Sequence, residues 1–337
     1  MKRTFTILPL TCAAAALALA GCSSASKEAK EAPSTKAKDG ITVVASFYPL
    51  VYLAQQIGGE NVSVTNLTPS GEAHEAELAA SQVDEIGSAD LVVYESQFQP
   101  SVDKAIEQTK PAHVIDVASH VDLVPIEQHE SAIDTDDHDH EAEHDHDHEA
   151  EHDHDHEGHH HHHGSFDPHF WLAPSLYAEA IDPIVEQLSS IDKDNADTYK
   201  ANAEKLRASL TELDNDYKTQ LSNCATPTII VAHEAYGYMA DRYGFKQVGV
   251  TGINPEQETS AKRLEAVAKV AKDNNVKILF SESALNEKDS KTLSQQLGID
   301  TKVLDPLETQ VDDNRDYLAV MKDNLSSLAE AMQCKAK

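Results

Sequence analysis

Short apolar runs that alternate with helical segments constrain the fold of this chain more than any other feature. In the first half, four runs rich in β-branched residues are separated by stretches whose apolar residues follow helical spacing. The runs are ITVVASFYPL at 41–50, VSVTNLT at 62–68, ADLVVYE at 89–95 and HVIDVA at 113–118, with helices expected at about 75–87 and 100–109. Strands and helices of this length in alternation predict βαβ units and a parallel sheet.

A long uninterrupted helix is predicted for residues 193–222. The stretch contains no Pro or Gly, and its apolar side chains recur at helical spacing. Beyond it the alternation resumes with strands in TPTIIVAH, QVGVTG, VKILFSE and TKVLDPL, and helices from 234, at 259–274, at 287–297 and from about 314. The predicted fold class is α/β: two parallel-sheet lobes, 41–192 and 223–337, joined by this rigid helix, with a cleft between them. The chain is also too long for one comfortable core, which favours two domains.

A histidine-rich stretch interrupts the first lobe. Residues 137–164 contain 13 histidines, most of them alternating with Asp or Glu, and no Leu, Ile, Val, Phe or Tyr that could anchor the stretch in a core. Such a segment cannot offset its own ordering entropy, so we expect a disordered loop at 130–164. Imidazole and carboxylate are ligands of divalent metals, and repetition offers many weak sites. A solvated acidic linker or a purification tag are the alternatives, although only residues 159–163 are consecutive histidines.

The N-terminus predicts secretion. Lys2 and Arg3 precede an apolar run at 7–20 that is too short for a stable membrane span, so residues 1–21 indicate a signal peptide. The residues LAGC, which end at Cys22, resemble the cleavage box of bacterial lipoproteins, in which the cysteine becomes the lipidated first residue. We therefore expect an extracytoplasmic protein, anchored to the cell membrane by lipid on Cys22 through a flexible linker at 22–40. An uncleaved anchor helix is the alternative.

Two cysteines remain once Cys12 leaves with the signal and Cys22 carries lipid. Cys224 and Cys334 form an even pair in an oxidising compartment, so a disulfide between them and two free thiols are both open. The net charge of -31 repels phosphate backbones, which argues against nucleic acid as a partner.

Three histidines outside the loop occupy the positions where ligands of an α/β protein gather. His74 follows the strand and turn NLTPSGEAH, His169 lies in FDPHFWLAP, and His233 closes TIIVAH. Ligands of such folds collect beyond the carboxyl ends of parallel strands, so these histidines are candidates for a shared metal site. The remaining three lack this context, and we interpret them as structural or surface residues: His113, His120 and His129.

Six strings of residues point to a known family. They are ASFYPL, PSGEAHEAE, DPHFWLAP, HEAYGYMADRYG, GVTGINPEQETSAKRL and VLDPLE. In this order and spacing, over residues 41–334, they resemble the metal-specific solute-binding lipoproteins of bacterial ABC transporters (cluster A-I, or cluster 9), most closely the zinc-uptake members. The resemblance implies a monomeric receptor, not an enzyme, that captures Zn²⁺ outside the membrane and delivers it to a cognate permease and ATPase. It also implies two lobes packed on a backbone helix, here 193–222, with the ion between them.

The resemblance further implies a set of metal ligands. The histidine ligands of the family fall on His74, His169 and His233. The members most similar to this sequence carry a glutamate ligand after PL, which is Glu308 here, and we favour it as the fourth ligand over Asp305 of the same string. Asp305 would then be a turn residue at the end of a strand. Three imidazoles and one carboxylate suit tetrahedral zinc, whereas manganese members replace one histidine by a carboxylate.

Two other functions stay open from the sequence. A secreted zinc hydrolase also uses three protein ligands, but it needs an open coordination position and a general base, for which Glu234 is the candidate. The string HEAYG lacks the second histidine of an HExxH site. A zinc-storage or adhesion lipoprotein would bind metal only through the loop, weakly and at many sites. One tightly bound zinc ion without turnover would separate the receptor from both.

Overall fold

A computed structural model describes residues 40–71, 73–131, 133, 165–256, 259–282 and 287–335. The predictions for the signal peptide at 1–21, for Cys22 and for most of the loop at 130–164 therefore lie outside the described residues. Within the described ranges, no helix combines the length and the apolar character needed to cross a bilayer.

The first half of the chain forms a four-stranded parallel sheet in the order β2-β1-β3-β4. Its strands are β1 (Ile41–Ala45), β2 (Val62–Asn66), β3 (Leu91–Tyr94) and β4 (Val114–Asp116). Its helices are α1 (Tyr48–Gly58), α2 (Ala80–Ser88), α3 (Pro100–Thr109), α4 (Ile126–His129), α5 (Pro174–Tyr177) and α6 (Ile181–Ile191). Val43 and Val44 of β1 are buried on opposite faces, as a strand covered on both sides requires.

The second half repeats this order with a four-stranded parallel sheet, β6-β5-β7-β8. Its strands are β5 (Thr228–Val231), β6 (Lys246–Gly249), β7 (Ile278–Ser281) and β8 (Asp300–Val303). Its helices are α8 (Gly237–Tyr243), α9 (Ala261–Asp273), α10 (Glu287–Leu297) and α11 (Tyr317–Ala331). The α/β class with two parallel sheets, predicted from the sequence, is confirmed.

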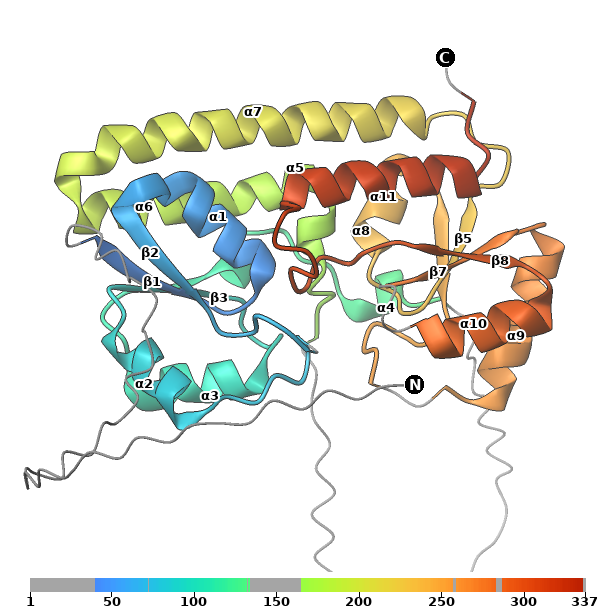
Figure 1. The fold of residues 1–337 in the computed structure, drawn as a ribbon, viewed down its shortest axis with the longest axis horizontal. Helices are drawn as coiled ribbons and strands as arrows, with labels where there is room; N and C mark the ends of the chain where they lie inside the picture. Colours follow the sequence, from blue (N-terminus) through green and yellow to red (C-terminus); the bar gives the residue numbers. More distant parts are fainter. Residues whose placement is uncertain are drawn as a thin grey trace, which may run out of the picture. The chain divides into compact units, whose positions relative to one another are not determined.

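Helix α7 (Ala196–Gln220) is the predicted long helix, and it contacts both halves of the chain. It begins three residues later than predicted because residues 193–195 form a 3₁₀ turn. The side chain of Asn202 donates a hydrogen bond to the Ile57 carbonyl of α1 (3.1 Å), and the Tyr217 hydroxyl donates to the Met321 carbonyl of α11 (2.6 Å). Figure 1 shows α7 alongside α1 and α6 at one end and α11 at the other.

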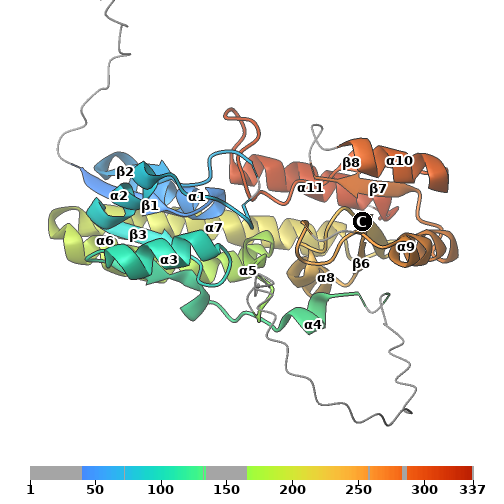
Figure 2. The same cartoon turned by 90° about the horizontal axis from the view of Figure 1, so that it is seen from below.

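One hydrophobic core continues through both halves. It includes Val43 and Val93 of the first sheet, Leu210 of α7, and Val231 and Phe280 of the second sheet. Two smaller clusters fill the opposite faces, one between the first sheet and helices α2 and α3, the other between the second sheet and helices α9 and α10. The described chain from Gly40 onward accordingly forms a single compact unit. Figure 2 shows α2 and α3 in the first half and α9 and α10 in the second from below.

Several boundaries differ from the sequence-based prediction for local reasons. The apolar run at 41–50 divides into β1 and α1, and Pro49 lies in the first turn of α1, where its missing N–H breaks no hydrogen bond. The helix predicted at 75–87 begins only at Ala80, because the preceding residues form the loop that carries His74. The structured chain also extends past residue 130: the Ser131 N–H donates to Glu234 (3.1 Å), and Ile133 packs against the outer cluster of the second sheet.

A disulfide joins Cys224 to Cys334. Of the two states that the sequence left open, the structure contains the paired one. The bond links the segment after α7 to the segment after α11, 110 residues later in the chain. Closing a loop of this length restricts the unfolded chain, so the bond favours the folded state.

Candidate metal centre

Four side chains from distant parts of the sequence converge at one point. His74, His169, His233 and Glu308 each offer a ligand atom, and these atoms all lie within 4.8 Å of one another. Oε1 of Glu308 is 3.5 Å from Nε2 of His74 and of His169, and 3.3 Å from Nε2 of His233. All four residues are at most 7% exposed. The structure thus brings together the four residues that the sequence nominated.

Four of the six separations among these atoms fit a tetrahedral metal ion. With zinc–ligand bonds of about 2.0–2.2 Å, two ligands of a tetrahedral ion lie roughly 3.3–3.6 Å apart. The three distances to Oε1 fall in this range, as does the 3.3 Å between Nε2 of His169 and Nε2 of His233. Nε2 of His74 and Oε1 of Glu308 are buried without a hydrogen-bond partner, which is costly unless a cation binds them. The donor set and its spacing both suit zinc.

His74 lies in the loop between β2 and α2, and the next strand-to-helix turn fixes that loop. The side-chain amide of Gln99 donates to the Ala73 carbonyl (2.9 Å) and to the Thr68 hydroxyl (3.2 Å). The Phe98 ring stands edge-on to the His74 imidazole, with 4.8 Å between the ring centres. His74 therefore has little freedom to leave the cluster.

His169 is held from behind by Asp167. Oδ1 of Asp167 accepts the backbone N–H of His169 (3.0 Å) and its Nδ1–H (2.7 Å), while Oδ2 accepts Nδ1–H of His129 (2.5 Å). Burial alone would raise the pKa of the Asp167 carboxyl, but His169 and His129 lower it to about 2. Because a carboxylate can only accept, Nδ1 of His169 carries the proton and Nε2 turns its lone pair toward the cluster.

His233 has the same kind of support from Glu282. Its Nδ1 lies 2.5 Å from Oε1 of Glu282. His233 follows β5 and Glu282 follows β7, and these strands are neighbours in the second sheet. The carboxyl ends of adjacent parallel strands thus supply both the ligand and the group that orients it.

Glu308 is presented by a tight turn after β8. The Asp305 carboxylate accepts the N–H of Leu307 (2.8 Å), and the Asn324 side chain bonds both the N–H (3.0 Å) and the carbonyl (2.7 Å) of Asp305. Leu307 has φ 61°, a left-handed conformation that is uncommon for a non-glycine residue. Asp305 is thus a turn residue bound to the backbone, and it is not among the four clustered side chains.

The single tryptophan joins two of the segments that carry these side chains. Trp171 Nε1 donates to the Pro306 carbonyl (2.7 Å), two residues before Glu308. The Trp171 ring lies 5.2 Å from the His169 ring, measured between centres. We therefore expect the fluorescence of Trp171 to change when a metal binds at the cluster.

Burial and the carboxylates together set the charges of the cluster. Burial lowers the pKa of His74. Burial also opposes protonation of His169 and His233, but Asp167 and Glu282 outweigh it, so both pKa values are raised, that of His233 to about 10. Burial alone would raise the pKa of the Glu308 carboxyl, yet the histidines hold it well below its usual range. Glu308 is therefore an anion aimed at the centre of the cluster.

Comparison with known proteins identifies the family. Residues 43–331 match the family described as zinc-uptake complex component A, periplasmic. The chain belongs to this family. The high-affinity zinc uptake system protein ZnuA of Bacillus subtilis is 33% identical over 307 residues, which cover 88% of this chain and 89% of that protein. The resemblance predicted from the six sequence strings is therefore confirmed.

Streptococcal relatives extend this comparison. The zinc-binding lipoprotein AdcA of Streptococcus pneumoniae is 30% identical over 339 residues, which cover 98% of this chain but only 61% of AdcA. This chain thus spans about three fifths of that relative's length. The zinc-bound ZnuA-like domain of the same AdcA, a solved crystal structure, is 28% identical with a TM-score of 0.66, covering 87% of this chain and 99% of the domain.

The groups behind the histidines of this zinc-uptake family member were not predicted from the sequence. Glu282 ends the VKILFSE strand, so the strand-end criterion that found His233 could also have found it. Asp167 stands two residues before His169, but its bond to His129 joins positions 38 residues apart and has no signal in the sequence. His129 is indeed structural: it is buried, and a Cβ at Gly237 would lie 2.3 Å from its ring, so only glycine lets α8 approach it.

Glu234, the candidate general base, is committed to structural contacts. It is fully buried, and its Oε1 accepts hydrogen bonds from the Gly249 N–H (2.9 Å), from Arg263 (3.1 Å) and from the Ser131 hydroxyl. Its Oε2 accepts the Ser131 N–H (3.1 Å). Both carboxylate oxygens thus hold the chain around His233 in place.

Proposed function

We propose that this protein is an extracytoplasmic receptor that captures one zinc ion and passes it to the permease and ATPase of an ABC transporter. The observation that carries the proposal is the buried set of three imidazoles and one carboxylate at tetrahedral spacing. His74, His169, His233 and Glu308 are the proposed ligands, with Asp305 in the turn that presents Glu308. The names of ZnuA and AdcA, a zinc uptake system protein and a zinc-binding lipoprotein, support the same function.

The donor set argues against a hydrolase. A catalytic zinc ion keeps one coordination position open for water and has a general base beside it. Here side chains supply all four positions of a tetrahedral ion, and Glu234 has both oxygens hydrogen-bonded. Such a site binds the ion itself tightly and leaves no position at which a substrate or water could react. This arrangement suits capture of zinc and not catalysis.

We also propose that the receptor is a monomer tethered to the cell membrane by lipid on Cys22. The LAGC string supports the tether, and the name of AdcA as a lipoprotein agrees with it. Metabolic labelling with a radioactive fatty acid tests the proposal: the wild type should incorporate label, and Cys22→Ala should not. Equal labelling of both would exclude Cys22 as the anchor.

Titration of the mature chain with zinc against a competing chelator, recorded through Trp171 fluorescence, tests the metal site. One equivalent should saturate the signal. His233→Ala should weaken binding about a hundredfold to a thousandfold, because a four-ligand zinc site is worth about 10–16 kcal/mol in all. His113→Ala is the control, since His113 is exposed and pairs with Gln187.

Three results would contradict the receptor. Unchanged affinity in His233→Ala would remove the assigned site. Weak binding at many sites without a tight one would favour the storage or adhesion lipoprotein. Zinc-dependent cleavage of ester or peptide substrates would favour the hydrolase.

A further inference from the structure

A cavity of about 410 Å³ adjoins the metal centre. Among the four proposed ligands, His74 alone belongs to its described lining, and His74 is only 3% exposed. Other lining residues reach the surface: Asp122 is exposed, and Phe166 is 43% exposed. The cavity therefore reaches from solvent to the His74 side chain, which makes it the candidate route for an arriving ion.

The cavity wall is acidic. Its described lining includes four carboxylate residues and no Lys or Arg: Glu95, Asp116, Asp122 and Glu130. A concave surface with charge of one sign concentrates ions of the opposite sign and speeds their capture. This wall therefore favours small cations over anions.

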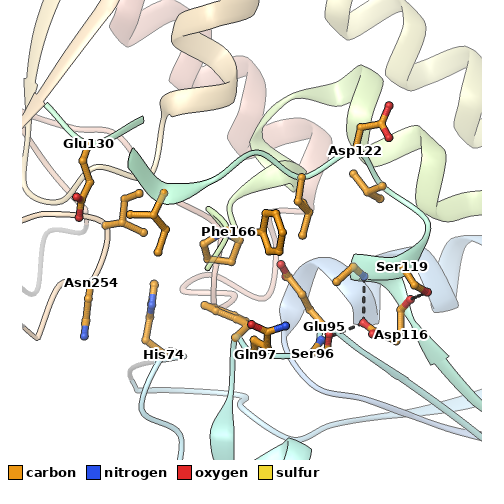
Figure 3. Close-up of a pocket in the computed structure, with 17 residues that line it drawn as sticks. His74, Glu95, Ser96, Gln97, Asp116, Ser119, Asp122, Glu130, Phe166 and Asn254 are labelled. Atoms are coloured by element: carbon orange, nitrogen blue, oxygen red, sulfur yellow. Dashed lines mark hydrogen bonds between the residues drawn. The ribbon is translucent and has the colours of Figure 1, made fainter. Parts of the chain in front are cut away.

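Glu95 stands out among these acids because it is buried. It is 2% exposed, it lines the cavity, and its Oε2 has no hydrogen-bond partner. In the view of Figure 3, Glu95 lies between His74 and Asp116. Burial, helped by Asp167 and Asp116, raises the pKa of the Glu95 carboxyl well above its usual range. Such a carboxyl is neutralised by a proton or by a bound cation, and a divalent cation that displaced the proton would give the unpaired Oε2 a partner.

The turn after β3 follows Glu95, which lines the same cavity as His74. Gln97 has φ 68°, a left-handed conformation, and its N–H donates to the Asp103 carboxylate (3.0 Å). The next residue is Phe98, whose ring stands edge-on to His74. One turn thus carries both the unpaired carboxyl and the ring that supports His74. Non-glycine residues in this conformation gather at functional sites.

From these observations we propose that Glu95 is the centre of a second, weaker site for a divalent cation, on the path by which zinc reaches His74. The inference rests on the proposed receptor function and adds the route of capture to it. Carboxylate oxygens hold zinc less firmly than three imidazoles do, so an ion at Glu95 passes on to the tight centre.

Rapid mixing of the full mature chain with zinc, followed by Trp171 fluorescence, tests the path. In Glu95→Gln the association rate should fall about tenfold or more. The dissociation rate should fall by the same factor, because a group on the path changes both rates and leaves the affinity of the tight centre unchanged. Glu60→Gln, which removes an exposed carboxylate outside the cavity, should alter neither rate. Glu95→Asp keeps a carboxylate and should recover most of the rate, which excludes a folding defect.

Mn²⁺ binding to the zinc-loaded protein tests the site itself. Zinc then fills the tight centre, and Mn²⁺ favours oxygen ligands. Electron paramagnetic resonance should count one bound Mn²⁺ fewer in Glu95→Gln than in the wild type, and no fewer in Glu60→Gln. An unchanged zinc association rate or an unchanged Mn²⁺ count overturns the proposal. If the wild type lacked a tight zinc centre, the proposed receptor function would be wrong. The number of Mn²⁺ ions bound by metal-free wild type and Glu95→Gln would still test the second site.

Discussion

Asp305 and Glu308, three residues apart in one turn, have different roles at the metal centre. Asp305 accepts the N–H of Leu307, and burial, with the nearby charge of Glu308, raises its pKa to about 6. Glu308 instead faces His74, His169 and His233. Their positions predict opposite responses to the same chemical change.

We expect Glu308→Gln to weaken zinc binding about a hundredfold, because a neutral amide oxygen replaces the only anionic ligand. Asp305→Asn should change the affinity only a few-fold, since the amide oxygen can still accept the N–H of Leu307. Competition titration with a chelator measures both. A large loss in Asp305→Asn beside a small loss in Glu308→Gln would reverse the two roles.

Asp167 gives the next prediction, although it would not touch the ion. Asp167→Asn should lower zinc affinity about tenfold to a hundredfold, because His169 loses the carboxylate that fixes its tautomer and strengthens it as a ligand. Asp241→Asn is the control: its carboxylate reaches His129 on the other ring nitrogen (3.4 Å) but is 74% exposed. The same chelator competition applies. Equal effects of the two variants would mean that Asp167 acts only through general charge.

The proposed metal ligands could be predicted from the sequence, whereas the carboxylates that orient the histidines were harder to predict. His233 and the turn that carries Glu308 follow strands whose periodicity is readable, and motif resemblance assigned their roles. Asp167 acts through a contact between segments far apart in sequence, and Glu95 is distinguished by its burial. Burial of a carboxylate depends on how the whole chain packs, which a local pattern does not encode.

Among the elements, α7 depends on a carboxylate near its C-terminal end. Oδ1 of Asp214 accepts Nε of Arg242 (2.5 Å) and the hydroxyl of Tyr243 (2.9 Å), both from α8, and Oδ2 accepts a second Arg242 nitrogen (2.8 Å). Burial alone would raise the pKa of Asp214, but these donors and Lys218 lower it to about 2. Asp214 thus ties the long helix to the second half of the chain.

Asp214→Asn should lower the free energy of unfolding by about 1 kcal/mol at neutral pH, a modest loss because Arg242 is partly exposed and solvent screens the pair. The folded pKa lies below the unfolded value of about 3.9, so this stabilisation is present above about pH 3.9 and is lost as pH falls toward 2. Urea unfolding of both proteins at pH 7 and near pH 2 measures the difference. A difference that grew in acid would contradict this account.

The elements whose residue pattern extends over many residues could be predicted from the sequence. Helix α7 was located from helical spacing and the strands of the described residues from β-branched apolar runs, within five residues at their ends. Helices α4 and α5 have only four residues each, about one helical turn, which is too short for a repeating apolar pattern to be recognised. Helix α6 was not predicted either. Its sequence contains Pro183, which usually argues against a helix, but Pro183 lies in the first turn, where proline is tolerated.

In the molecule as a whole, the two sheets share one continuous core along α7. Separating the halves widely would expose apolar surface at about 25 cal/mol per Å². We therefore expect metal uptake to involve a small tilt of one half against the other, in place of a wide hinge opening. Crystal structures with and without zinc would measure the rotation, and an opening as wide as that of hinged two-domain receptors would contradict this expectation.

The described ends of the histidine-rich loop lie near the proposed path of zinc. Phe166, just after the loop, forms an isolated antiparallel β-bridge with Pro125 and lines the acidic cavity. The N–H of Ile126 also donates to the Ser165 carbonyl (3.2 Å). Before the loop, Ser131 bonds Glu234, the neighbour of His233. The described residues on either side of the loop therefore lie at the cavity or beside the neighbour of His233. We propose that the loop gathers zinc without forming part of the tight centre.

Replacing residues 134–164 by a short Gly/Ser linker should leave one tight zinc ion and remove the weak ones. Because the sequence predicts a disordered loop, each loop site is expected to order chain as it binds, and that entropy lowers its affinity far below that of a preformed buried cluster. A full-length control with the 13 loop histidines changed to Ser keeps the chain length and the acids, and it should also lose the weak sites. Calorimetry counts both classes of ion, and growth of cells carrying either variant should suffer only when zinc is scarce. Loss of the tight ion in both variants would show instead that the loop supplies a ligand, because the four buried side chains would then be insufficient alone.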